Sequence, residues 1–555
     1  MNVLGLTATI SWNTAAALVR DGRLVAAAEE ERFNRIKQAP RMPPVQSAGY
    51  CLQSAGLTAA DIDYVAVGFA APIRYAFLRA IGTLRDLEIE NFLYTFPSLG
   101  EYLIQQYKLR RDLEEAIPGI TGRPWVYVRH HVAHAASALY ASGFAEANVL
   151  TIDGNGEDDS ALLGVAEGGK LRVLGRKLAP ESLGGLYSNA TQQLGFVRHV
   201  EEGKTMGLAA YGEPVVEFGG LRVGSDSYDM DRRFLVSGFW EGLGAPRRAG
   251  EEINDGDRDF AASIQNTLEE AGMALARGLH QTTGKRALCL AGGVVLNCDM
   301  NAKILGLDCV DEVFIQPAAH DAGTALGAAL EVASRHGDPT DFVMEHAYWG
   351  PEYGNEEIQA FLDEAKVAYT RPPDIEQAVA ERLAAGDIVG WFQGRMEIGP
   401  CALGGRSILA NPAMPEMKDK VNSEVKHREG WRPFAPSMLE EEAPNLLFDS
   451  HPSPFMLLTF TVKPEWREGL SAAMHVDDTV RSQTVSRKTN PRYHGMISKF
   501  QSLTGVPAVL NTSFNDRGEP IVMSPQDAVR CFYSTGLDQL AIGDFLVSKN
   551  RHGTS

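Results

Sequence analysis

An internal repeat near the N-terminus constrains the fold of this chain more than any other feature of its sequence. Residues 3–27 are predicted to form a strand, a polar turn, a second strand, a glycine turn and a third strand. The same plan returns without gaps 146 residues later, over residues 149–173, and helical segments follow both units. Duplicated units of this kind predict an α/β fold with two subdomains around a cleft.

The length of the chain indicates more than one domain. A single hydrophobic core stops growing at about 250–300 residues, and this chain has 555 residues. A cluster of aromatic, glycine and proline residues at 348–354 precedes a new helical pattern, which is typical of a domain boundary. We therefore expect a first domain over residues 1–349 and a second domain over residues 350–555.

The charge of the chain limits its partners. Its 71 acidic residues outnumber its 52 basic residues and give a formal net charge of −19, which argues against a surface that binds nucleic acid or anionic lipid. The N-terminus lacks the basic region of a signal peptide, and no apolar run reaches the ~20 residues of a membrane span, so we expect a cytoplasmic enzyme. Any anionic substrate must then bind in a local basic pocket.

Four residues form a candidate metal site. His130 and His134 are four residues apart, so a helix that begins near His130 presents both on one face. Asp153 ends an apolar strand, and Asp321 stands where the N-cap of a helix is expected. Nitrogen and carboxylate ligands together suit Fe(II), Mn(II) or Zn(II). The alternative is that the histidines are structural and that the aspartates are a turn residue and a cap.

A glycine turn between a predicted strand and a predicted helix is a second candidate site. The segment 286–297 carries Gly292 and Gly293 in the turn and Asn297 after it. Backbone N–H groups at such a turn can approach a nucleotide phosphate. A tight connection without any ligand is the alternative.

Basic residues gather in the second domain. Arg406 lies in a loop rich in glycine and proline, and Lys426 and Arg432 follow it, with prolines that keep Arg432 on an extended backbone. Asn511 and Asn515 stand at the end of an apolar strand. Arginine side chains bind phosphate through two hydrogen bonds, and lysine adds a point charge. The cations alternate with aromatic residues, which favours an anion pocket over a solvated run of charge.

Six ordered motifs resemble the NodU/CmcH family of O-carbamoyltransferases, and the match covers nearly the whole chain. The motifs are residues 130–138, 202–212, 291–297, 320–327, 432–437 and 511–515. The resemblance implies an N-terminal domain of the actin, sugar-kinase and Hsp70 (ASKHA) type, similar to tRNA threonylcarbamoyl transferase. It also implies a C-terminal YrdC-like α/β domain.

The resemblance further implies an activity. The second domain would form carbamoyladenylate from carbamoyl phosphate and ATP with Mg²⁺, and the first would transfer the carbamoyl group to a hydroxyl of a small natural-product acceptor beside an Fe(II) ion. The implied metal ligands are His130, His134, Asp153 and Asp321. The implied catalytic residues of the donor site are Lys426, Arg432, Arg481 and Ser513. A homo-oligomer is compatible with this pattern.

The sequence departs from the family at two positions. Trp12 stands in the first hairpin loop where members usually have a histidine, a candidate base for the acceptor, and Cys401 stands where they usually have an arginine that contacts carbamoyl phosphate. One charge-assisted hydrogen bond, worth about 1.5–3 kcal/mol, would be missing at Cys401. Two alternatives therefore stay open: a divergent paralogue with another acyl donor or an amine acceptor, and a non-catalytic subunit that binds a nucleotide. The acceptor, its base and the role of loop 213–256 also stay open.

Overall fold

The computed structural model describes residues 1–75, 89–231 and 246–549, and its contacts divide the chain into two units. Unit 1 comprises Met1–Asn34 and Gln38–Met344, and unit 2 comprises Arg35–Lys37 and Glu345–Ser555. The last residue of unit 1, Met344, lies five residues before the end of the first domain that the sequence predicts, residue 349.

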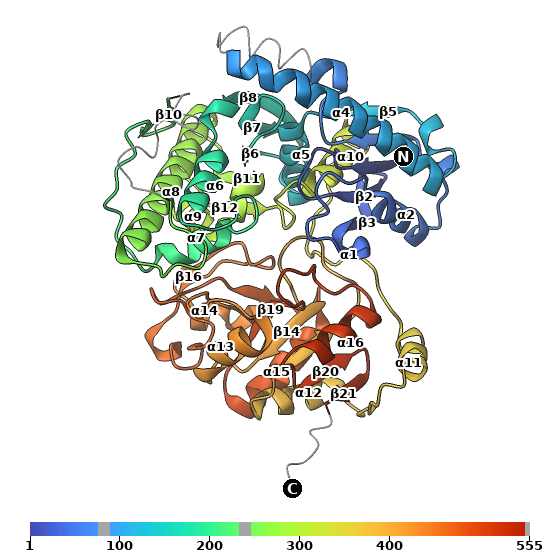
Figure 1. The fold of residues 1–555 in the computed structure, drawn as a ribbon, viewed down its shortest axis with the longest axis vertical. Coiled ribbons are helices and arrows are strands. Elements are labelled where there is room, and N and C mark those ends of the chain that lie inside the picture. Colours follow the sequence, from blue (N-terminus) through green and yellow to red (C-terminus); the bar gives the residue numbers. More distant parts are fainter. Residues whose placement is uncertain (76–88, 232–245, 550–555) are drawn as a thin grey trace. The chain divides into compact units, whose positions relative to one another are not determined.

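Unit 1 contains two five-stranded sheets with the same topology (Figure 1). The first has the order β3-β2-β1-β4-β5, and its strands are β1 (Asn2–Leu6), β2 (Ala15–Arg20), β3 (Arg23–Glu29), β4 (Tyr64–Val67) and β5 (Trp125–Tyr127). The second has the order β8-β7-β6-β11-β12, and its strands are β6 (Ala147–Ile152), β7 (Asp159–Glu167), β8 (Lys170–Leu178), β11 (Ala287–Ala291) and β12 (Glu312–Ile315). In both sheets an antiparallel meander is followed by two parallel strands. The predicted duplication and the actin-like α/β architecture are confirmed.

Two central helices fix the site-bearing parts of unit 1. α5 (His130–Ser142) packs against α10 (Gly323–Arg335). A Cβ atom on Gly327 of α10 would lie 1.7 Å from the carbonyl oxygen of Ala133 on α5, so only glycine permits this approach. The close packing sets the start of α5 beside the loop that leads into α10.

The remaining helices of unit 1 complete its layers. They are α1 (Glu31–Asn34), α2 (Val45–Ser54), α4 (Ile89–Ala116), α6 (Leu183–Gln193), α7 (Glu202–Ala209), α8 (Asp255–Thr283) and α9 (Cys298–Leu305), with the strand pair β9 (Leu221–Val223) and β10 (Tyr228–Met230). Part of loop 213–256, residues 232–245, lies outside the described residues. Within the described residues, no helix combines the length and the apolar character that crossing a membrane requires.

Unit 2 is built on a seven-stranded mixed sheet of order β18-β15-β19-β14-β13-β20-β21. Its strands are β13 (Val389–Phe392), β14 (Arg406–Ala410), β15 (Ala435–Leu439), β18 (Gln483–Val485), β19 (Ala508–Ser513), β20 (Gln539–Ile542) and β21 (Phe545–Ser548), and a further pair is β16 (Phe460–Thr461) with β17 (Thr479–Val480). Its helices are α11 (Asn355–Glu364), α12 (Ile375–Ala384), α13 (Glu416–Val421), α14 (Ala443–Leu446), α15 (Pro491–Thr504) and α16 (Pro525–Ser534).

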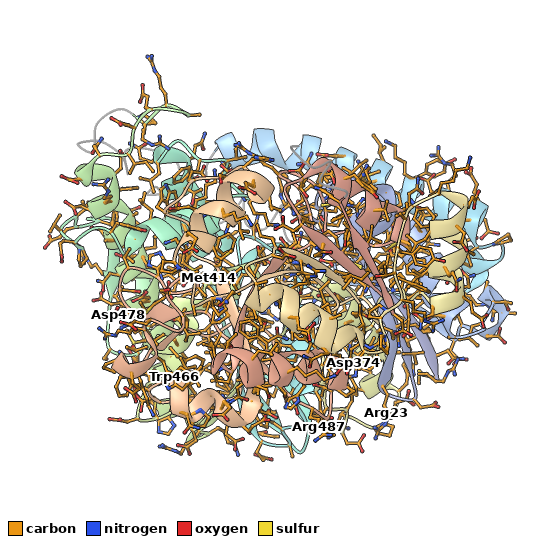
Figure 2. The ribbon with its side chains drawn as sticks, turned by 90° about the horizontal axis from the view of Figure 1, so that it is seen from below. Arg23, Asp374, Met414, Trp466, Asp478 and Arg487 are labelled. Carbon is orange, nitrogen blue, oxygen red and sulfur yellow. The ribbon has the colours of Figure 1, made fainter. Side chains whose placement is uncertain are left out.

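Capping and apolar burial hold unit 2 together. Asp374, labelled in Figure 2, caps α12 by accepting the N–H of Gln377 at 3.0 Å and also receives the ammonium of Lys499 from α15 at 2.6 Å. Phe392 and Phe514 lie in the core of the sheet and are at most 1% exposed. These contacts order the strand ends on which the site residues of this unit stand.

A short segment near the N-terminus belongs to unit 2. Arg35 donates from its guanidinium to the carbonyl oxygens of Ile521 at 2.7 Å and Pro520 at 2.8 Å, and Lys37 donates to that of Glu519 at 3.3 Å. The chain therefore leaves unit 1 after Asn34 and returns to it at Gln38.

Candidate functional site

The structure brings the four predicted metal ligands together in unit 1. Nε2 of His130, in the first turn of α5, lies 3.0 Å from Oδ2 of Asp153 and 3.0 Å from Nε2 of His134, one turn further along. Oδ1 of Asp321 lies 3.6 Å from Nε2 of His130 and 3.9 Å from that of His134. One ligand atom from each residue lies within 4.8 Å of the others.

Backbone N–H groups orient both carboxylates. Oδ1 of Asp153 accepts the N–H of Gly293 at 2.8 Å, so Oδ2 faces the histidines. Oδ2 of Asp321 accepts the N–H of Trp12 at 3.0 Å, so Oδ1 faces them. Gly292, with φ of +99°, lets the turn reach the end of β6, because a Cβ there would lie 2.3 Å from the carbonyl oxygen of Ile152.

The buried charges of the cluster depend on one another. Burial alone would lower the pKa of His130, but the hydrogen bond to Asp153 and the charge of Asp321 raise it to about 9. Burial would raise the pKa of Asp153, but its bonds to His130 and His134 hold it well below its usual range. Burial and the charge of His130 lower the pKa of His134. The cluster therefore favours the ionised form of Asp153.

The donor set fits a divalent cation. Two ligand atoms that bind one cation at right angles, each at about 2.1 Å, lie roughly 3 Å apart. The spacings of 3.0–3.9 Å between imidazole nitrogens and carboxylate oxygens are of this size. The neighbouring His131 points elsewhere, since its ring contacts Thr151 Oγ1 at 2.7 Å and the carbonyl oxygen of Asp159 at 3.1 Å.

The polar groups of the glycine turn have hydrogen-bond partners within unit 1. The N–H of Gly293 is already donated to Asp153. Oδ1 of Asn297 accepts the N–H of Met300 at 2.9 Å, and its amide exchanges hydrogen bonds with Gln265 at 2.9 and 2.8 Å. Contact of Gly292, Gly293 and Asn297 with a phosphate stays a prediction, and a phosphate there would have to compete with these internal partners.

In unit 2, Lys426 lies among the oxygens at the end of β19. It ends a five-residue π-helix, Asn422–Lys426, a rare conformation that is frequent at functional sites. Its Nζ donates to the carbonyl oxygen of Ser513 at 2.5 Å, to Oδ1 of Asn515 at 2.7 Å and to Ser513 Oγ at 3.2 Å. Burial lowers the pKa of Lys426 well below that of an ordinary lysine, and the charge of Arg428 lowers it further.

Arg428, which the predicted set of site residues omits, joins the predicted cations. Its guanidinium lies 4.3 Å from the ring centroid of Phe434 and donates to Oδ1 of Asn422 at 2.7 Å. Burial lowers its pKa to about 9, and the charges of Arg432 and Arg481 add to the shift. Arg432 and Arg481 are thus close enough to Arg428 for their charges to act on it. The spacing of Lys426 and Arg428 in the sequence was the signal that could have identified Arg428.

Arg406 and Asn511 have structural partners. Arg406 is fully buried, donates to the carbonyl oxygens of Gln393 at 2.9 Å and Gly405 at 3.0 Å, and lies 3.7 Å from the ring centroid of Phe392. Asn511, 1% exposed, donates to the carbonyl oxygen of Ala402 at 3.0 Å. These hydrogen bonds hold the sheet and the loop next to it, and contact of either residue with a ligand stays a prediction.

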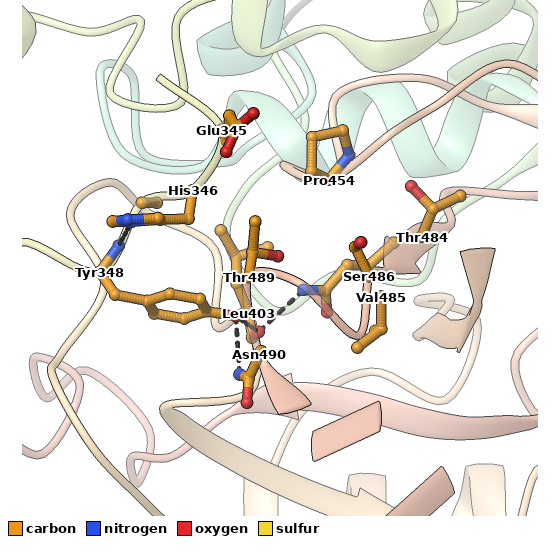
Figure 3. A pocket seen from close by; sticks show the side chains of 12 residues that line it. Glu345, His346, Tyr348, Leu403, Pro454, Thr484, Val485, Ser486, Thr489 and Asn490 are labelled. Carbon is orange, nitrogen blue, oxygen red and sulfur yellow. Dashed lines mark hydrogen bonds between the residues drawn. The ribbon is translucent and has the colours of Figure 1, made fainter. Parts of the chain in front are cut away.

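The loop that carries Cys401 is held on several sides. The carbonyl oxygen of Leu403 accepts from Tyr348 Oη at 2.6 Å and from Gln483 Nε2 at 2.8 Å, and the N–H of Leu403 donates to Glu397 at 2.7 Å. A water-sized cavity of about 10 Å³ lies beside this loop, with Tyr348 and Leu403 in its wall (Figure 3). The loop thus presents the half-exposed Cys401 from a fixed backbone.

Comparison with known proteins covers both units. Residues 2–330 match the family described as "Carbamoyltransferase N-terminus", and residues 380–549 match "Carbamoyltransferase C-terminus". The chain is 39% identical to nodulation protein NolNO of Sinorhizobium fredii, over 99% of this chain and 80% of that protein. It is 42% identical to nodulation protein NolO of Bradyrhizobium diazoefficiens (76% and 79%) and 37% identical to uncharacterized protein sll1178 of Synechocystis (99% and 97%).

Proposed function

The chain belongs to the carbamoyltransferase family and is an enzyme of carbamoyl transfer, and we propose that it takes the carbamoyl group from carbamoyl phosphate with the use of ATP. In this proposal unit 2, as a YrdC-like domain, hydrolyses carbamoyl phosphate to carbamate and inorganic phosphate, and the carbamate oxygen attacks the α-phosphorus of ATP, which forms carbamoyladenylate and releases pyrophosphate. Unit 1 then transfers the carbamoyl group to a hydroxyl of a small molecule, and AMP leaves.

The observation that carries the proposal is the group of cations around Lys426. Lys426, Arg428, Arg432 and Arg481 gather in unit 2 of a chain whose net charge is −19. Carbamoyl phosphate and ATP are both polyanions, and fixed cations stabilise the charge that develops when the adenylate forms. Ser513 and Asn515 hold the ammonium of Lys426 in place. The donor reaction is therefore proposed for this part of unit 2.

Unit 1 would carry out the transfer. His130, His134, Asp153 and Asp321 would hold a divalent metal, with Fe(II) as our candidate, which supplies Lewis-acid chemistry toward a carbonyl or an acceptor hydroxyl. The N–H groups of Gly293 and Trp12 keep one oxygen of each carboxylate turned to the cluster. These hydrogen bonds fix the direction of both carboxylates toward the cluster.

Pyrophosphate release tests the donor half of the proposal. The full-length protein is incubated with ATP, Mg²⁺ and carbamoyl phosphate, and pyrophosphate is measured by a coupled assay. We expect release that requires both ATP and carbamoyl phosphate. Release with acetyl phosphate but not with carbamoyl phosphate would contradict the donor assignment.

Cys401 favours a second candidate, a transferase with another acyl donor. The loop around Cys401 accepts hydrogen bonds from Tyr348 and Gln483 and donates one to Glu397, yet the side chain of Cys401 is uncharged. A donor with one negative charge fewer than carbamoyl phosphate would need one cation fewer. Pyrophosphate release with ATP and acetate, a singly charged donor, in place of carbamoyl phosphate separates the two candidates.

A further inference from the structure

Trp12 and His199 form an aromatic stack on unit 1. Their ring centroids are 5.2 Å apart, and their planes are inclined by 27°. The two residues are 187 positions apart in the chain, so the contact is made by the fold and not by local sequence. Trp12 is 41% exposed, which is unusual for the largest aromatic side chain. The stack therefore presents a flat apolar surface to solvent.

His199 is held in a fixed position within this stack. Its backbone is in the left-handed region with φ of +64°, its N–H donates to Glu202 at 2.5 Å, and its carbonyl oxygen accepts from Gln38 at 3.2 Å. Arg198 donates to its Nε2 at 3.0 Å. A non-glycine residue in this conformation carries strain that the surrounding contacts must overcome. These contacts hold His199 in place against Trp12.

The stack adjoins the candidate metal cluster. The backbone N–H of Trp12 donates to Asp321, whose other oxygen faces His130 and His134. The charges of Asp153 and Asp321 also act on His199. Val197 and Val200, on either side of His199 in the chain, are 58% and 49% exposed. An exposed apolar surface next to a reactive centre is typical of a ligand site.

We propose that Trp12 and His199 are positioning residues that bind the acceptor through one face of a ring. The proposal rests on the proposed function, in which the acceptor supplies a hydroxyl. A cyclic polyol carries hydroxyls around its edge and C–H groups on its face, so it can stack on the indole while one hydroxyl reaches the cluster. At this position of the loop, Trp12 cannot take up a proton, but it can select an acceptor by the shape of its ring.

A fluorine NMR titration tests the proposal without any turnover. The full-length protein, labelled with 5-fluorotryptophan at its seven tryptophans, is titrated with methyl β-D-glucopyranoside, and the Trp12 resonance is assigned by its loss in Trp12→Phe. We expect this resonance to shift and saturate with the glucoside but not with the acyclic polyol D-sorbitol. A resonance that does not move overturns the proposal, and an equal shift with sorbitol overturns the selection of rings.

A kinetic comparison adds a second readout. With the glucoside as acceptor, we expect Trp12→Ala to raise KM about tenfold and Trp12→Phe less than threefold, as is usual for a lost aromatic contact. Tyr107→Ala, which alters a 69% exposed aromatic residue on α4, is the matched control and should change neither constant. An unchanged KM in Trp12→Ala overturns the proposal.

The two proposals fail in different ways. Absence of pyrophosphate release from the wild-type protein refutes the donor chemistry, while the fluorine titration still decides whether Trp12 binds the ring. Pyrophosphate release without acceptor is measured in the control Tyr107→Ala, where we expect the wild-type rate. An equal rise of the acceptor KM in Trp12→Ala and Tyr107→Ala would mean a general defect and would overturn the role of Trp12 in acceptor binding.

Discussion

The metal cluster of unit 1 and the cation cluster of unit 2 satisfy their polar groups in opposite ways. In unit 1, each aspartate uses one oxygen to accept a backbone N–H and keeps the other for the cluster. In unit 2, Lys426 already donates to oxygens of Ser513 and Asn515. A carboxylate has more lone pairs than these hydrogen bonds use, whereas the three N–H donors of the Lys426 ammonium are already engaged by neighbouring oxygens. A ligand thus meets prepared acceptors in unit 1, but must compete with internal acceptors in unit 2.

The largest effect is expected from removing a ligand of the cluster in unit 1. We expect His130→Ala to lower metal affinity by ~100-fold or more, since even groups that only orient ligands contribute 10–100-fold. Metal content after dialysis, measured by mass spectrometry, should fall in this variant and stay unchanged in His280→Ala, whose ring contacts the carbonyl oxygen of Lys285. Equal metal content in wild type and His130→Ala would refute the metal assignment.

The matching change in unit 2 is Lys426→Met. We expect pyrophosphate release to fall about 100-fold, because a fixed charge that stabilises the developing phosphate charge is lost. Metal content should not change, which would separate the two clusters functionally. Lys488→Met, at a side chain that is 72% exposed, is the control. A loss of metal in Lys426→Met, or an unchanged rate of pyrophosphate release, would contradict separate roles for the two clusters.

A smaller effect is expected from restoring a cation at position 401. If carbamoyl phosphate is the donor, Cys401→Arg should lower its KM by about tenfold or more, which corresponds to one charge-assisted hydrogen bond. Cys309→Arg, at another half-exposed cysteine, serves as the control. An unchanged KM in Cys401→Arg would show that the loop does not face the donor.

The smallest effect is a pH dependence of the donor reaction. The pKa of Lys426 is lowered by burial and by Arg428, so its charge is lost at a lower pH than that of an ordinary lysine. We expect kcat/KM for pyrophosphate release to decline on the alkaline side, below pH ~10.4, the usual lysine value. Bound anions favour the charged form, so kcat should decline at a higher pH than kcat/KM. If the residual kcat/KM of Lys426→Met declines at the same alkaline pH as that of the wild type, the decline belongs to another titrating group.

The sequence was sufficient to nominate the four residues of the cluster, and the structure brings them together. The spacing of His130 and His134 matches one helical turn, and Asp153 ends a strand whose repeat partner is visible in the sequence. The repeat in the sequence also predicted the duplication, and the structure shows two sheets with the same strand order. Local sequence patterns therefore predicted both the duplicated fold of unit 1 and the residues of its candidate site.

The hydrogen-bond partners of Arg406 and Asn511 could not be predicted from local sequence patterns. A loop with cations and glycines looks the same whether its side chains face solvent or point into a sheet. The partners of Arg406 are carbonyl oxygens of Gln393 and Gly405, and those of Asn511 include that of Ala402, more than 100 residues away. Only the three-dimensional structure decides such cases, and it also brings Trp12 onto His199.

The segment Arg35–Lys37 has a consequence for the gene. Because these residues make their contacts with Glu519, Pro520 and Ile521, a cut at Met344 would leave part of unit 2 on the N-terminal fragment. Neither fragment would then be a complete folding unit. We therefore expect the two halves to resist separation into independent genes, and any engineered split protein to require reassociation of both chains before unit 2 is whole.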